Sequence, residues 1–274
     1  MKNRWLVISV CLGYIAVSNY RKFAMRRIHS SIRRFEAKRW EVKIDYENQK
    51  IYGELIFPKD HKADTLIIAS HGFNGSMTYF KQGLGYRLAE EGYALYAYDF
   101  INGSRHSRSG GKIENMSVLD EIAQLKAVYS HFQNEFENII LAGESQGGLI
   151  TTLAISELEH IKAVILYYPA YSAVDHAVKR LANGENEMFR VKLKTGYTKE
   201  LAAINLEEKI RNITIPAILI HGSKDKTVDI GYSYWAKELN PDIELHVITD
   251  KDHGFDQEGR EEASQYVSEF LKRL

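Results

Sequence analysis

The serine at position 145 has the surroundings of a nucleophile. It is the centre of the pentapeptide Gly143 to Gly147, which has the pattern G-x-S-x-G; an apolar, β-prone run precedes it and a helix-like run follows it. A strand, tight turn and helix in this order raise the serine hydroxyl onto the rim of a sheet. The hydroxyl then lies near a helix N-terminus, where negative charge is favoured. We therefore predict that Ser145 is a nucleophile; the alternative is an ordinary serine in a glycine-rich turn.

An acid and a base suited to activate this serine occur further along the chain. Asp225 follows a predicted strand at 217–221, and His253 follows another at 244–248. Because the carboxyl ends of parallel strands meet at one edge of a sheet, these side chains are expected beside Ser145. We predict that His253 is the general base and that Asp225 orients its ring, as in serine hydrolases with the chain order Ser, Asp, His.

Two backbone amides are candidates for the oxyanion hole. The first is the N–H of Gln146, the residue directly after the nucleophile. The second is the N–H of Phe73, in a His-Gly-Phe sequence that follows the predicted strand at 65–70. A donor of this kind is typically worth about 3 kcal/mol of the reaction barrier.

Several neighbouring residues offer alternative interpretations. Asp229 and Asp252 are alternatives for the acid, although Asp229 is also suited to begin the next helix as a cap. We expect His71 and His221 to form structural hydrogen bonds in loops. The ten histidines show no metal-ligand spacing, so we expect no metal site.

Strands and helices alternate along most of the chain after residue 40. This alternation predicts an α/β protein with a mostly parallel sheet covered by helices on both faces. The strands are expected at 42–46, 51–57, 65–70, 93–100, 138–142, 163–168, 217–221 and 244–248, and the helices at 80–91, 116–131, 149–154, 230–239 and 259–274. The alternation lapses at about 170–215, which we interpret as a small cap; a connecting helix on the sheet face is the alternative.

The N-terminal segment differs in charge from the rest of the chain. Residues 1–40 contain ten Lys or Arg and one acid, a net charge of +9, whereas residues 41–274 carry −9. The apolar run 5–17 is shorter than the roughly 20 residues of a spanning helix. Apolar residues then recur at helical spacing among arginines, a pattern typical of helices on anionic lipid surfaces. The single cysteine, Cys11, excludes a disulfide within the chain.

We therefore expect a cytoplasmic protein whose residues 1–35 associate with an anionic membrane surface. The alternatives are a cationic helix packed on the acidic domain, a disordered tail, or a cleaved export signal. Nucleic-acid binding is not expected.

Residues 50–272 resemble the α/β-hydrolase superfamily, and within it the bacterial cinnamoyl/feruloyl esterases and their monoacylglycerol-lipase-like relatives. The motifs that carry the resemblance are HGFNG at 71–75, YDF at 98–100, GKIENMSVL at 111–119, SQGG at 145–148, HGSKD at 221–225, and His253. The resemblance implies ester hydrolysis through an acyl-enzyme, oxyanion donors at Phe73 and Gln146, and no cofactor.

The chain departs from that group in three places. Glu144 replaces the histidine that is common before the serine, and the loop 102–111 is longer and more basic. The cap is short, and Asp175 is the nearest candidate there for a contact with a substrate phenol.

The predicted function is a serine hydrolase that cleaves a small-molecule carboxylic ester. A serine peptidase or aminopeptidase and a monoacylglycerol lipase are alternatives on the same site. A third alternative is a non-catalytic ligand-binding protein that retains the fold.

Overall fold

The structure is a computed structural model that describes residues 38–58, 63–80 and 84–274. The chain divides into two units, residues 1–36 and 37–274, and the description below concerns the second. The predictions made for the N-terminal segment, its membrane association included, lie outside the described residues, except at 38–40. These three residues form the start of the first strand. No helix in the described part of the chain has the length and hydropathy needed to cross a bilayer.

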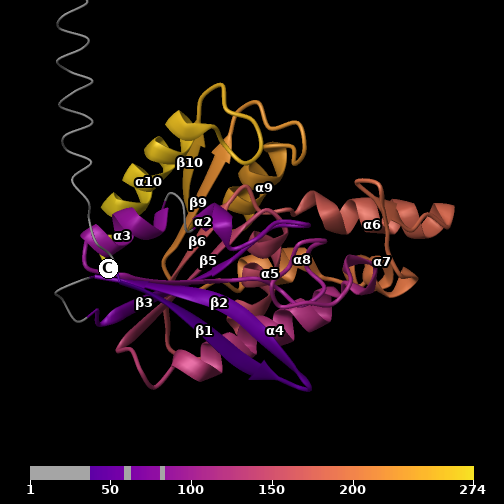
Figure 1. Cartoon of the computed structure of the whole chain (residues 1–274). Coiled ribbons are helices and arrows are strands. Elements are labelled where there is room, and N and C mark those ends of the chain that lie inside the picture. The colour runs from indigo at the N-terminus through magenta and orange to yellow at the C-terminus, as the bar shows by residue number, and fades with distance from the viewer. Residues whose placement is uncertain (1–37, 59–62, 81–83) are drawn as a thin grey trace, which may run out of the picture. The chain divides into compact units, whose positions relative to one another are not determined.

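An eight-stranded, mostly parallel sheet runs through residues 38–274, as the alternation of elements predicted (Figure 1). Its spatial order is β1-β2-β4-β3-β5-β6-β9-β10; β1 and β2 form an antiparallel hairpin, β2 pairs antiparallel with β4, and the other pairs are parallel. The strands are β1 (Lys38–Tyr46), β2 (Gln49–Phe57), β3 (Thr65–Ser70), β4 (Ala94–Tyr98), β5 (Asn138–Glu144), β6 (Ile161–Tyr167), β9 (Ala217–Gly222) and β10 (Glu244–Ile248).

The central strands β3, β4 and β5 are almost wholly buried, which their continuous apolar sequences require. Helices α4, α5 and α8 pack together on one face of the sheet with α9, and α3 and α10 lie on the other (Figure 1). The helices are α2 (Thr78–Phe80), α3 (Tyr86–Glu90), α4 (Val118–Phe132), α5 (Gln146–Ala154), α6 (Ser172–Asn183), α7 (Thr195–Ala202), α8 (Leu206–Arg211), α9 (Gly231–Leu239) and α10 (Gln257–Leu271), with short 3₁₀ turns η2 (Ile113–Asn115) and η3 (Ile155–Glu157).

One predicted element near residue 90 differs from the structure. In the helix expected at 80–91, the structure describes α2 up to Phe80 and α3 over Tyr86–Glu90, and residues 81–83 lie outside the described part. The strand expected at 93–100 ends at Tyr98, because the carboxylate of Asp99 accepts hydrogen bonds from the amides of Met77 and Arg108 and holds the chain in a loop.

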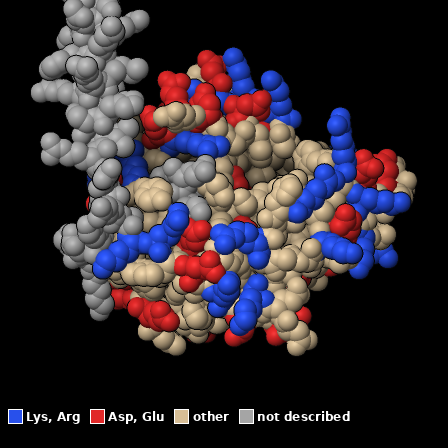
Figure 2. Space-filling model, viewed as in Figure 1, with Lys and Arg blue, Asp and Glu red and all other residues tan. Residues whose placement is uncertain are grey.

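The segment predicted as a cap contains α6, α7, α8 and a hairpin of β7 (Glu187–Met188) and β8 (Val191–Lys192). Helices α6 and α7 pack against each other and extend to one side of the sheet (Figure 1). Helix α8 instead packs against α5 and α9. We name residues 172–202, from α6 to α7, the insertion. On the face seen in Figure 2, basic side chains gather on this region among acidic ones.

The turn between β5 and α5 depends on glycines that have no room for a side chain. A Cβ at Gly147 would collide with the backbone carbonyl of Ser70 at the end of β3, and one at Gly143 would collide with the backbone of Gly147. The helix α5 can therefore approach the sheet only with glycine at these positions.

We predict that Gly147→Ala lowers the free energy of unfolding by about 1–3 kcal/mol, because strand β3 or helix α5 must move to admit the methyl group. Urea denaturation measures the change. Gly196→Ala is the matched control: it lies in α7, where the nearest atom to the new Cβ is 3.9 Å away. This control should leave stability unchanged or raise it slightly. Equal stability of the two variants would show that the turn tolerates a side chain.

Candidate active site

Ser145 occupies a strained turn at the carboxyl edge of the sheet. Its backbone has φ 50° and ψ −119°, a conformation that side chains rarely adopt. The turn is held from both sides: the N–H of Ser145 donates to the carbonyl of Tyr167 at 3.0 Å, and its carbonyl accepts the N–H of Ala170 at 2.8 Å. Such strain, maintained by surrounding hydrogen bonds, fixes the direction of the Ser145 hydroxyl.

The side chains of Ser145, His253 and Asp225 form one continuous chain of hydrogen bonds. Nε2 of His253 lies 3.0 Å from Oγ of Ser145, and Nδ1 of the same ring lies 2.7 Å from Oδ2 of Asp225. They follow β5, β10 and β9, so three segments far apart in sequence meet at one edge. Because the carboxylate accepts from Nδ1, Nε2 is free to accept the serine proton.

The side chain of Asp225 is completely buried yet surrounded by donors. Oδ2 also accepts from Nε2 of His221 at 3.1 Å, and Oδ1 accepts from the amides of Thr227 and Val228 at 2.8 and 2.9 Å. Burial by itself would raise the pKa of Asp225, but the hydrogen bonds from His221, His253 and Val228 together hold it well below its ordinary value. The carboxylate is therefore ionised when it faces the imidazole of His253.

His221 lies in β9 and connects this carboxylate to helix α9. Its Nε2 faces two acceptors, Oδ2 of Asp225 and the carbonyl of Val228, each at 3.1 Å, so Nε2 carries a proton. Nδ1 lies 2.6 Å from Oγ of Ser233. The sequence predicted only that His221 forms structural hydrogen bonds in a loop. The structure places it near the end of strand β9, where its Nε2 bonds to the carboxylate of Asp225.

The His-Gly-Phe loop after β3 lies against the nucleophile. A Cβ at Gly72 would be 3.0 Å from Cβ of Ser145, which shows how closely the two segments approach. Nε2 of His71 accepts the N–H of Phe100 at 3.0 Å, so Nδ1 carries the proton and donates to the carbonyl of Gly72 at 2.7 Å. No acceptor among the described residues is bonded to the N–H of Phe73. The first N–H of α5, on Gln146, cannot bond within its own helix.

Glu144, the residue before the nucleophile, is buried behind this loop. Its Oε1 accepts the N–H of Gly72 at 3.2 Å, and its Oε2 accepts the hydroxyl of Tyr168 at 2.9 Å. Burial raises the pKa of Glu144, and the two hydrogen bonds partly offset that rise. The ring of Tyr168 packs against the His253 ring, with centroids 4.5 Å apart. Glu144 thus connects the loop that carries Phe73 to the residue that supports the imidazole.

The side chain of Gln146 connects the nucleophile turn to the insertion. Its Oε1 accepts the hydroxyl of Tyr197 in α7 at 2.6 Å, and its Nε2 donates to Oε2 of Glu121 in α4 at 2.6 Å. A second connection runs through Glu200 of α7, whose carboxylate accepts the hydroxyl of Ser117 and the first amides of α4. An acid at a helix N-terminus is stabilising, so α7 is fixed to α4 at two points.

A small cavity of about 70 Å³ contains the Ser145 side chain. The insertion supplies most of its wall, through α6, the β7–β8 hairpin and Tyr197 of α7. The lining residues are Phe73, Ser145, Gln146, Ala170, Ser172, Ala173, His176, Arg180, Met188, Phe189, Tyr197, Thr227 and Val228. We name this cavity the Ser145 pocket.

Comparison with known proteins gives consistent relatives. A family model described as serine aminopeptidase, S33, matches residues 61–194. The structure of the esterase Pf2001 from Pyrococcus furiosus is 29% identical and has a TM-score of 0.68, covering 87% of this chain and 93% of that one. Est1E from Butyrivibrio proteoclasticus, with ferulic acid bound, is 24% identical with a TM-score of 0.74, covering 84% and 99%.

This chain has the α/β-hydrolase fold. The resemblance to α/β-hydrolase esterases predicted from the sequence motifs is therefore confirmed. Among curated proteins, alpha/beta hydrolase domain-containing protein 17C of Mus musculus is 28% identical over 179 residues. That match covers 64% of this chain and 49% of the mouse protein, so the chain spans about half the length of this relative.

The other acids proposed from the sequence lie elsewhere in this hydrolase. Asp229 accepts the N–H of Gly231 at the start of α9, and Asp252 accepts the amide of Lys226 on the surface. Asp175, the candidate for a contact with a substrate phenol, does not line the Ser145 pocket; its carboxylate accepts the hydroxyl of Tyr232 at 2.7 Å on the other side of α6.

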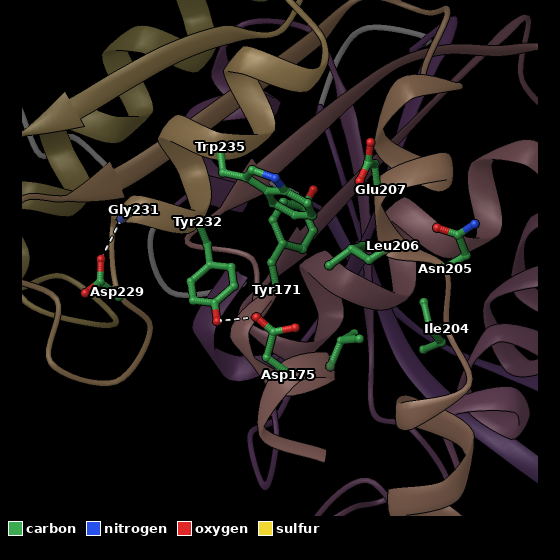
Figure 3. Close-up of a pocket in the computed structure, with 11 residues that line it drawn as sticks. Tyr171, Asp175, Ile204, Asn205, Leu206, Glu207, Asp229, Gly231, Tyr232 and Trp235 are labelled. Atoms are coloured by element: carbon green, nitrogen blue, oxygen red, sulfur yellow. Dashed lines mark hydrogen bonds between the residues drawn. The ribbon is translucent and has the colours of Figure 1, made fainter. Parts of the chain in front are cut away.

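That side of α6 faces a second and larger cavity, of about 480 Å³ (Figure 3). Its walls combine the aromatic rings of Tyr171, Tyr232 and Trp235 with carboxylates such as Asp175 and Glu207. Ser145 and His253 do not line it, so the larger volume does not mark the chemical site. Helix α6 therefore separates two cavities of different chemical character.

Glu121 was not predicted from the sequence to belong to the site. Burial raises its pKa to about 8, and the hydrogen bond from Gln146 only partly opposes that effect. The carboxyl group thus holds a proton in the folded protein at pH values where the unfolded chain has lost it. The contribution of Glu121 to the free energy of unfolding must therefore fall as the pH rises from 4.5, the ordinary pKa of this group, to about 8.

We predict that Glu121→Gln, which cannot ionise, stabilises the hydrolase relative to wild type by an amount that grows across that pH range and then levels off. The gain is at most about 1.4 kcal/mol for each pH unit. Urea unfolding at several pH values measures it. Glu135→Gln, at an exposed position, is the control and should keep the wild-type pH dependence. A constant difference between Glu121→Gln and wild type would contradict the assignment.

Proposed function

We propose that this hydrolase cleaves carboxylic esters through an acyl-enzyme intermediate on Ser145. The observation that carries the proposal is the hydrogen-bonded chain from Oγ of Ser145 through both ring nitrogens of His253 to Asp225. A serine hydroxyl is a weak nucleophile by itself and needs a base within hydrogen-bond reach, oriented by a third group. Here His253 is the base within reach of Ser145, and Asp225 is the group that orients it.

The reaction begins when Oγ of Ser145 attacks the ester carbonyl and Nε2 of His253 takes its proton. The carbonyl oxygen becomes an oxyanion, and the amides of Phe73 and Gln146 donate to it. The intermediate then collapses, the alkoxide leaves with the proton from His253, and the acyl group remains on Ser145. Water then attacks the acyl-enzyme, with His253 again as the base, and the carboxylic acid is released. Asp225 stabilises the imidazolium in both steps.

Two observations favour an ester over a peptide. The similar structures Pf2001 and Est1E are an esterase and a protein solved with ferulic acid. An aminopeptidase must also bind the ammonium group of a peptide N-terminus, for which an acid is the ordinary partner. None of the described residues that line the Ser145 pocket is Asp or Glu.

We predict that Ser145→Ala lowers kcat for p-nitrophenyl butyrate by about 10³-fold or more, because the nucleophile is lost. Asp225→Asn should lower it by roughly 10³- to 10⁴-fold, since the ring of His253 is no longer held in the productive tautomer. Ser130→Ala, on the exposed end of α4, is the control. Undiminished turnover in Ser145→Ala would overturn the proposal. Faster Ser145-dependent cleavage of aminoacyl p-nitroanilides than of esters would favour the peptidase.

A further inference from the structure

The Ser145 pocket contains a guanidinium group that forms no hydrogen bond or ion pair with the described residues. Arg180 of α6 lines the pocket, and its Nη2 is buried without a hydrogen bond among the described residues. No carboxylate in the described part of the chain forms an ion pair with it. An unsatisfied buried donor is unfavourable, and more so when it belongs to a charged group. The arrangement indicates a position prepared for a negatively charged ligand.

A second basic side chain lies one helical turn before Arg180. His176 and Arg180 are four residues apart, which places them on the same face of α6, and both line the Ser145 pocket. The remaining lining residues are apolar or uncharged. Among the described lining residues, the only ionisable groups besides the Tyr197 hydroxyl are therefore the basic side chains of His176 and Arg180. Residues 41–274 as a whole, in contrast, have an acidic net charge.

Two acids that act electrostatically on Tyr197 in the pocket wall, Glu121 and Glu200, are already engaged. Glu200 accepts three donors at the N-terminus of α4. Glu121 is bonded to Gln146, and its raised pKa keeps it largely neutral near pH 7. Neither carboxylate is available to neutralise Arg180. A carboxylate on a bound molecule could therefore pair with the guanidinium without competition from these two acids.

Further basic residues lie at the rim beside Phe73. Nη2 of Arg105, in the long basic loop after β4, donates to the carbonyl of Arg190 in the β7–β8 hairpin at 3.2 Å. Phe189 in that hairpin packs on Phe73, with ring centroids 5.8 Å apart, and is 66% exposed. A substrate that approaches the loop that carries Phe73 thus passes cationic side chains.

The opposite side of α6 shows that this charge is local. There the second cavity is lined by Asp175, Glu207 and Asp229 and by no Lys, Arg or His among the described residues. Of these two cavities beside α6, only the Ser145 pocket has basic residues among its described lining residues.

We propose that the substrate of this site is an ester that carries a carboxylate, which Arg180 binds while Ser145 attacks the ester carbonyl. The inference rests on the proposed esterase function and narrows its substrate class. A guanidinium binds a carboxylate through two parallel hydrogen bonds, and it is more weakly hydrated than an ammonium, so Arg suits a partly buried site. The contact is present before and during the reaction, so its loss should act mainly on KM.

The test uses two pairs of esters that differ only in charge. The pair with the charge on the acyl side is the p-nitrophenyl monoester of adipic acid and the p-nitrophenyl ester of adipic monoamide. The pair with the charge on the alcohol side is 4-carboxyphenyl butyrate and 4-carbamoylphenyl butyrate. Rates with Ser145→Ala are subtracted as background. We expect the carboxylate ester of at least one pair to have the higher kcat/KM, by about tenfold to a hundredfold.

Arg180→Gln should remove that preference by raising KM for the carboxylate esters more than for the amide-bearing esters, and its circular dichroism spectrum shows that the variant folds. Lys179→Gln, at the exposed neighbouring position, is the matched control and should keep the preference. Arg180→Lys should keep part of it. No preference for either carboxylate ester in wild type, or a preference that persists in Arg180→Gln, would overturn the inference. Absence of Ser145-dependent turnover for all four esters would instead refute the esterase function itself.

Discussion

The site depends on keeping the carboxylate of Asp225 ionised in a position that water does not reach. Removing a charge from water is costly unless donors replace the lost hydration. Four donors do so here: two histidine rings, His221 and His253, and the amides of Thr227 and Val228. They come from β9, the loop after it and the loop after β10. These loops must therefore place donors around both carboxylate oxygens of Asp225. The hydrogen bond from His253 to Oδ2 in turn fixes the orientation of the His253 ring.

The nucleophile turn imposes a second constraint, because it must remain strained. Contacts from β3, β6 and the loop after β6 hold Ser145 in its unusual backbone conformation. Buried polar side chains then extend outward from the turn: Glu144 reaches the Phe73 loop, and Gln146 reaches the insertion. The insertion that shapes the pocket is thus fixed to the same few residues that position the reacting atoms. Stability and substrate recognition share one hydrogen-bonded network.

The sequence predicted the sheet and the three central side chains because their signals are local. A glycine-flanked serine after an apolar run, and an acid and a histidine after later strands, can be recognised without knowing how the chain packs. Arg180 and Glu121 could not be recognised in this way. Their surroundings arise only when α6 and α4 pack near the turn after β5, although an acid on the otherwise apolar face of α4 was a usable signal. The sequence also does not reveal which face of α6 meets Ser145, and Asp175 lies on the other one.

Reaction with a fluorophosphonate, followed by intact mass measurement and peptide mapping, tests most directly whether His253 activates the Ser145 hydroxyl. The reagent modifies a serine quickly only when a base activates the hydroxyl. We expect one adduct per chain, on Ser145, and much slower labelling in His253→Gln. An unmodified Ser145 in the wild-type protein, or equal labelling rates in wild type and His253→Gln, would contradict this expectation.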